Sequence, residues 1–141
     1  MNFSNISITL LRLAVSYIWL SKGITKLFDT LFITTFQRSI VQVINSTPYE
    51  FYSIFLKQFA LPNAIIIAQL GIWTEILAGV AFLLGFPLLI AIICGIFLNV
   101  NYFFASLFPQ LQLFNVLMIF AQLAVYGNSS RDTVGIKFGK K

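Results

Sequence analysis

The 141-residue chain contains no histidine and a single cysteine, and only 9% of its residues are charged. Without histidine, a haem with a proximal histidine and the usual histidine-based zinc or copper sites are excluded within this chain. Cys94 has no partner for an intrachain disulfide, and we interpret it as a small buried hydrophobic residue. We therefore expect neither a metal nor a haem.

Hydrophobic residues, by contrast, are abundant. They make up 59% of the chain, and the mean hydropathy is +0.92. Charged residues form about 25% of an ordinary soluble domain, so this composition indicates one compact membrane-embedded unit. The net charge of +5 suits contact with the membrane surface. A nucleic-acid-binding protein would need a basic face interleaved with exposed aromatic residues, and no such pattern occurs.

The breaks between apolar runs predict how the chain crosses the bilayer. Residues 58–130 hold one charged residue, Glu75, and can cross three times at about 20 residues per span. Proline and glycine breaks divide them into predicted spans at 63–85, 87–107 and 111–127. Residues 6–26 form a further span, and no basic segment or cleavage site marks them as a signal peptide. The predicted fold is all-α, a multi-pass bundle of four transmembrane helices.

Residues 27–62 are apolar at helical spacing but are interrupted by charged and polar residues. We expect two amphipathic helices that lie at the membrane interface or fold back on the bundle, with one longer tilted span as the alternative. The basic tail, residues 128–141, is expected to lie along the membrane surface. The connection after the first span and the C-terminal tail would lie on opposite sides of the membrane, and they carry equal numbers of lysines and arginines. The orientation of the chain in the membrane therefore stays open.

Glu75 falls near the midplane of its predicted span, where an unpaired carboxylate is costly. Arg12 differs from it by only about 6 Å in depth, at 1.5 Å per residue. The sequence therefore predicts an Arg12–Glu75 pair, with Asn99 and Asn101 completing the hydrogen bonds. Two interpretations remain: a structural pin between two helices, or a polar pocket for a substrate or a proton path.

Lys22 and Lys26 lie one turn apart at the end of residues 6–26. They either extend to the lipid headgroups or bind an anion at the mouth of the bundle. Near the same face, Asn101–Tyr102 and Phe103–Phe104 either form a wall for a quinone-like ring or belong to an interfacial aromatic belt.

Several segments resemble one family of membrane proteins. "LRLAVSYIWLSKGITKLF", with Arg12 and a Gly23-x-x-Lys26-Leu27 signature, resembles the first helix of the DoxX/DoxD proteins. "WTEILAGVAFLLGF" is similar to their second-helix motif and "FLNVNYFFASLFP" to their third. Asn115 and "VYGN" match the fourth. The tail departs from the pattern, because Lys137 stands where family members have an acid.

This resemblance implies a four-helix membrane protein linked to sulfur and redox chemistry. DoxD-type members form, with a second subunit, an oxidoreductase that passes electrons from thiosulfate to a membrane quinone. We therefore expect a quinone-linked oxidoreductase subunit in a prokaryotic plasma membrane, with a membrane quinone as electron acceptor and a second subunit or a second copy as partner. The alternatives are a non-catalytic membrane anchor of a redox complex and a small transporter. The expected catalytic residues are Glu75 and Arg12, and the expected substrate-binding residues are Lys22, Lys26, Asn99, Asn101, Tyr102 and Asn115.

Overall fold

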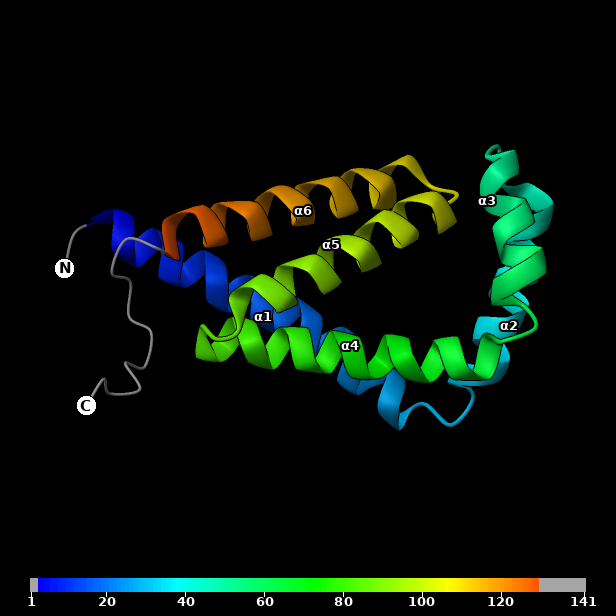
Figure 1. Cartoon of the computed structure of the whole chain (residues 1–141), viewed down its shortest axis with the longest axis horizontal. Helices are drawn as coiled ribbons and strands as arrows, with labels where there is room; N and C mark the ends of the chain where they lie inside the picture. The colour runs from blue at the N-terminus through cyan, green and yellow to red at the C-terminus, as the bar shows by residue number, and fades with distance from the viewer. Residues whose placement is uncertain (1–2, 130–141) are drawn as a thin grey trace.

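The computed structural model describes residues 3–129, and every regular element in that range is a helix. Four long helices lie side by side: α1 (Phe3–Phe28), α4 (Ala64–Leu84), α5 (Leu88–Ala105) and α6 (Pro109–Ser129) (Figure 1). Between α1 and α4 come α2 (Phe32–Ser46), α3 (Glu50–Phe55) and the π-helical turn η1 (Leu56–Ala60). This short-helix layer stands across the end of the bundle at which α4 begins (Figure 1). The predicted all-α class is confirmed.

Glycine and proline place the helix ends where the sequence predicts breaks. α4 ends at Gly85, whose φ of 77° lies in the left-handed region that favours glycine. The amide of Gly85 donates to the carbonyl of Ala81 at 2.8 Å. Pro87 directly precedes α5, and Pro109 is the first residue of α6, a position at which its missing amide hydrogen costs nothing.

Three of the described helices are long and apolar enough to cross a membrane: Ala64–Leu84, Leu88–Ala105 and Pro109–Asn128. α1 is longer than any of them, at 26 residues, but does not belong to this set. It carries Arg12, Lys22 and Lys26 together with several hydroxyl side chains, which lower its hydropathy. On composition alone, three of the four predicted spans are therefore supported.

α1 and α4 run antiparallel and approach each other closely at two glycines. A Cβ added to Gly23 would lie 2.6 Å from Cγ1 of Ile76, and one added to Gly79 would lie 2.6 Å from Cγ of Leu20. The hydroxyl of Ser16 donates to the carbonyl of Gly79 at 2.8 Å. Small residues that allow backbones to approach are typical of helix pairs in membranes. This contact fixes the height of α1 relative to α4.

Two clusters of buried side chains hold the fold together. The larger lies among the four long helices and includes Trp19, Phe82 and Met118. The smaller joins the short-helix layer to the start of α4 through Ile40, Tyr52, Leu56, Ala60 and other residues. α2 and α3 are separate helices joined through Thr47–Tyr49, so residues 27–62 do not form one tilted span.

Candidate functional site

Glu75 is fully buried, with an exposed fraction of 0%. It lies near the middle of α4, where α1 approaches closely enough that a Cβ on Gly23 would be 3.2 Å from the Cβ of Glu75. Lys26 follows Gly23 by about one turn of α1. The contact at Gly23 therefore brings the end of α1, with its lysines, beside the buried acid.

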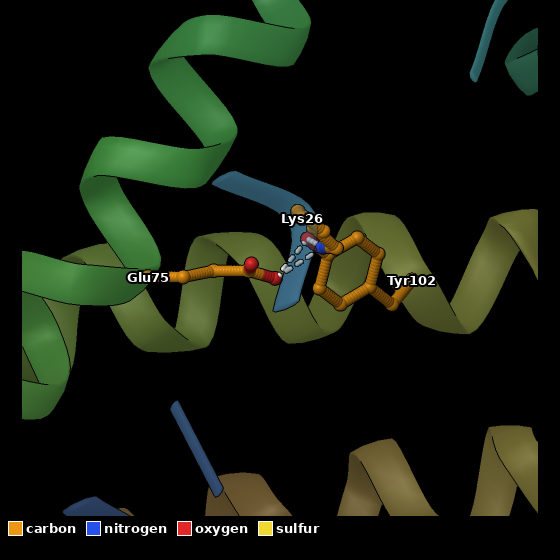
Figure 2. Close-up of polar contacts among 3 residues, drawn as sticks. All are labelled: Lys26, Glu75 and Tyr102. Atoms are coloured by element: carbon orange, nitrogen blue, oxygen red, sulfur yellow. Dashed lines mark hydrogen bonds and ion pairs between the residues drawn. The ribbon is translucent and has the colours of Figure 1, made fainter. Parts of the chain in front are cut away.

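Side chains from three helices meet at Glu75 (Figure 2). Nζ of Lys26, from α1, lies 2.6 Å from Oε1 of Glu75 and forms a salt bridge with it. Tyr102, from α5, donates its hydroxyl hydrogen to the same oxygen at 2.5 Å and accepts a hydrogen bond from Lys26 at 3.0 Å. An ammonium and a phenol thus offset the cost of burying the carboxylate. We call this group the Lys26–Glu75–Tyr102 cluster.

The predicted Arg12–Glu75 pair is wrong. Arg12 lies about three turns before Gly23, the residue of α1 that packs against Glu75. The backbone of Arg12 is therefore offset from the level of Glu75 by about 16.5 Å along α1, too far for a direct pair. The prediction placed both helices symmetrically about one midplane. The glycine contacts instead set the last turns of α1, rather than its first half, at the level of Glu75.

Lys22 lies one turn before Lys26 and has different neighbours. Its Nζ lies 5.4, 5.3 and 5.1 Å from the ring centroids of Trp19, Tyr102 and Phe114. Three aromatic faces at these distances stabilise an ammonium group electrostatically. The two lysines therefore approach Tyr102 together, one through its hydroxyl and both through its ring, whose centroid is 5.0 Å from Nζ of Lys26.

The predicted asparagines make a different set of contacts. The amide groups of Asn99, Asn101 and Asn115 each donate to the carbonyl four residues earlier on their own helix. Asn99 and Asn115 are buried, and their Oδ1 atoms have no hydrogen-bond donor in the described part of the chain. None of the three is hydrogen-bonded to the Lys26–Glu75–Tyr102 cluster. The predicted role of Asn99 and Asn101 in completing the hydrogen bonds of Glu75 is therefore wrong.

A cavity of about 790 Å³ lies beside the cluster, bounded by the short-helix layer, α4 and α5. Lys26, Tyr102 and Asn101 line it, and Lys26 is the one charged residue among its lining residues in the described part of the chain. Glu75 does not line the cavity, so Lys26 and Tyr102 stand between the cavity and the carboxylate. The remaining walls are mainly apolar, with Phe36, Ile40, Leu56, Phe59, Ile67 and Leu98 among them.

The cavity reaches the outer surface between α4 and α5. Ile66 and Leu70 of α4, and Ile93 and Phe97 of α5, line it and are exposed. Gly71 also lines it, and a Cβ added there would meet no atom within 4 Å. A ligand with a polar head and an apolar tail can therefore place its head at Lys26 and its tail on the outer face.

The expected wall of Phe103 and Phe104 does not line this cavity. Phe104 instead packs against the rings of Tyr49, Phe51 and Tyr52, with centroids 5.1 to 5.6 Å apart. Tyr52 lines the cavity and donates its hydroxyl to the carbonyl of Asn101 at 3.1 Å. Burial raises the pKa of Tyr52 to about 12, so this hydroxyl is protonated at neutral pH.

Comparison with known proteins gives a family. The family model described as DoxX matches residues 7–107, which is more than half of the chain and includes all three residues of the cluster. The chain belongs to the DoxX family. No curated protein and no solved structure gives a match. As a DoxX-family chain with three apolar helices of spanning length, it is a multi-pass integral membrane protein.

The contacts of two further residues of this DoxX-family chain were not predicted from its sequence. Gln122 is fully buried in α6, and its amide donates to the carbonyl of Met118 at 3.0 Å. Its Oε1 lies against Gly95 of α5, where a Cβ would overlap it. Tyr52 was also missed, although its place between aromatic residues of an amphipathic segment could have indicated a buried face. Asn128, part of the matched "VYGN", lies at the end of α6, whereas Lys137 lies outside the described residues.

Proposed function

We propose that this DoxX-family chain is the membrane subunit of a quinone-linked oxidoreductase of the prokaryotic plasma membrane, and that it binds the quinone ring in the cavity beside Lys26. The observation that carries the proposal is that Lys26 and Tyr102 line an otherwise mainly apolar cavity. Sites for cofactors and other small ligands are typically apolar clefts of about 300–1,000 Å³ with a few polar groups that orient the ligand.

The proposal includes α1 as a fourth membrane span. Its 26 residues extend about 39 Å, enough for a hydrocarbon core of about 30 Å. Two of its charges lie inside the bundle, because Lys26 pairs with Glu75 and Lys22 lies among aromatic rings. Charges that are paired or held in this way are compatible with a spanning helix.

A quinone fits both the polar groups and the apolar walls of the cavity. One ring carbonyl can accept a hydrogen bond from the ammonium of Lys26, which has three donor hydrogens. Tyr102 can add a second hydrogen bond if its hydroxyl hydrogen turns from Glu75 to the ligand. The isoprenoid tail can follow the exposed apolar side chains of Ile66, Leu70 and Phe97 towards the lipid. A quinone dissolved in the bilayer would thus enter sideways, without crossing an aqueous phase.

The proposed reaction consumes two electrons and two protons for each quinone reduced to a quinol. Thiosulfate, or a related reduced sulfur anion, supplies the electrons when two molecules join through a new S–S bond to give tetrathionate. Both protons come ultimately from water. The ring oxygen held at the cluster takes its proton from Lys26, and Glu75, within hydrogen-bond distance of Lys26 and Tyr102, passes on the proton that replaces it. The opposite ring oxygen, which the cluster does not reach, takes its proton from water. The second subunit, or a second copy of this chain, is proposed to bind the sulfur anion, because the quinone ring occupies the place beside Lys26.

Quinone binding by the purified protein in lipid nanodiscs tests the proposal. The informative variant is Gly71→Phe, whose ring would occupy the cavity, and Gly71→Ala is its matched control. We expect a short-chain ubiquinone or menaquinone analogue to bind the wild type and Gly71→Ala equally, and at least tenfold more weakly to Gly71→Phe. If no quinone binds to the wild type, the proposal is rejected in favour of a membrane anchor or transporter.

A further inference from the structure

Lys22 and the Lys26–Glu75–Tyr102 cluster together carry two ammonium groups and one carboxylate. In the described part of the chain, the charged groups that act on Lys22 are Glu75 and Lys26, and Lys26 already forms the salt bridge with Glu75. One positive charge is therefore left without a counter-charge at this end of the cavity. Such a charge in a membrane interior is unfavourable, and the binding of an anion nearby relieves it.

The uncompensated charge lies close to the cavity wall. Both ammonium groups lie within 5.3 Å of the ring centroid of Tyr102, and Tyr102 lines the cavity. Lys22 makes no hydrogen bond to the described residues, and the rings of Trp19 and Phe114 hold it in place. Aromatic faces attract an ammonium group but do not neutralise it, so its field extends into the low-dielectric cavity.

We infer that the cavity binds the anionic form of its ring ligand, an ionised quinol or hydroxyquinone, in preference to the neutral form. This inference rests on the proposed quinone site and adds charge selectivity to it. A negatively charged ring oxygen beside Lys26 forms a charge-assisted contact, whereas a neutral carbonyl accepts an ordinary hydrogen bond. Lys22 adds to this preference through its charge and not through contact, because it does not line the cavity.

Two probes of almost the same shape test the charge selectivity. 2-Hydroxy-1,4-naphthoquinones are acidic and ionised at neutral pH, whereas their methyl ethers are neutral. Both are titrated into nanodiscs that contain the wild type, Lys22→Met or Lys22→Arg. Lys57→Met is the matched control for loss of one positive charge, because Lys57 is exposed on η1 and does not line the cavity. The two probes partition differently into lipid, but this difference is the same for every variant. It therefore cancels when the ratio of the two probe affinities is compared between variants.

We expect Lys22→Met to lower the ratio of hydroxyquinone affinity to methyl ether affinity by about tenfold or more, since the lost charge acts across a short, poorly screened distance. Lys22→Arg and Lys57→Met keep the wild-type ratio. If Lys22→Met leaves the ratio unchanged while both probes bind, the inference is overturned and the proposed quinone site stands. If neither probe binds the wild type, both proposals fail.

A second measurement does not depend on the folding of any variant. Ionisation changes the visible absorption of a hydroxynaphthoquinone, so the protonation of the bound probe can be read directly in the wild type. The bound probe should stay ionised at a lower pH than the same probe in protein-free nanodiscs. An equal or higher ionisation pH would contradict the inference.

Discussion

Lys26 pairs with Glu75 because Gly23, about one turn earlier on α1, lies directly against the backbone of α4. A Cβ at Gly23 would be 3.0 Å from the amide nitrogen of Ile76, so any larger residue would move the two helices apart. The salt bridge of 2.6 Å therefore depends on a residue that has no side chain. This relationship gives the first two predictions.

Replacing Gly23 with alanine should destabilise the protein by about 1–3 kcal/mol, the typical cost of inserting a methyl group into a packed interface. Gly71→Ala is the matched control, because its Cβ would meet no atom and alanine favours a helix by up to about 1 kcal/mol over glycine. Thermal unfolding of the two variants in the same detergent measures the difference. Equal midpoints for the two would mean that the Gly23 contact is not tight.

A double-mutant cycle should detect the Lys26–Glu75 pair. Lys26→Met alone leaves a buried carboxylate unpaired, and such losses typically cost about 3–5 kcal/mol. Glu75→Gln combined with Lys26→Met should recover much of that loss, because the second change removes the unpaired charge. Arg12→Ala should add independently to Glu75→Gln, since those sites are far apart. Strong coupling between Arg12 and Glu75 would restore the pair that the structure rejects.

Glu75→Gln should keep the fold and lower thiosulfate-dependent quinone reduction, measured with the partner subunit present. Glutamine can still accept hydrogen bonds from Lys26 and Tyr102 but cannot take up and return a proton at neutral pH. We expect a fall in turnover of about 100-fold or more, the usual contribution of a positioned acid or base. Quinone binding should change much less. Wild-type turnover in this variant would exclude Glu75 from the proton path.

Tyr52 gives a prediction at alkaline pH. Its pKa is raised from 10.0 to about 12 by burial, so the folded state holds this proton more tightly than the unfolded state does. The associated stability is fully present below pH 10 and is lost as the pH rises towards about 12. The loss of thermal stability over this pH range should therefore be smaller in Tyr52→Phe than in the wild type. Absorbance at the phenolate band provides the control. The absorbance of the wild type minus that of Tyr52→Phe reports the ionisation of Tyr52, which should occur near pH 12.

The helix ends could be predicted from the sequence because they depend on local chemistry. Gly85, Pro87 and Pro109 stop or start helices through their own backbone restrictions, whatever surrounds them. The predicted spans 63–85 and 87–107 therefore differ from α4 and α5 by one or two residues at each end. The same reasoning predicted that Glu75 has a cationic partner, because a buried carboxylate requires one.

The identity of that partner could not be predicted. Lys26 and Arg12 are both cations on α1, and the choice between them depends on how far α1 slides along α4. That offset is set by contacts at Gly23 and Gly79 that form only when the helices pack. The cavity could not be predicted from the sequence pattern either, because it forms where the short-helix layer folds back onto α4 and α5.

The cluster also has a consequence for how the chain is made. Glu75 and Tyr102 follow Lys26 by 49 and 76 residues. During translation, α1 therefore leaves the ribosome well before α4 and α5 are complete. During that interval the lysines of α1 have neither the carboxylate nor the Tyr102 ring. A nascent α1 is therefore a poor membrane segment by itself, and its final depth is decided only when α4 and α5 arrive. Biogenesis of this protein should be sensitive to translation rate between α1 and α5, and to helper proteins that shelter a half-inserted first helix.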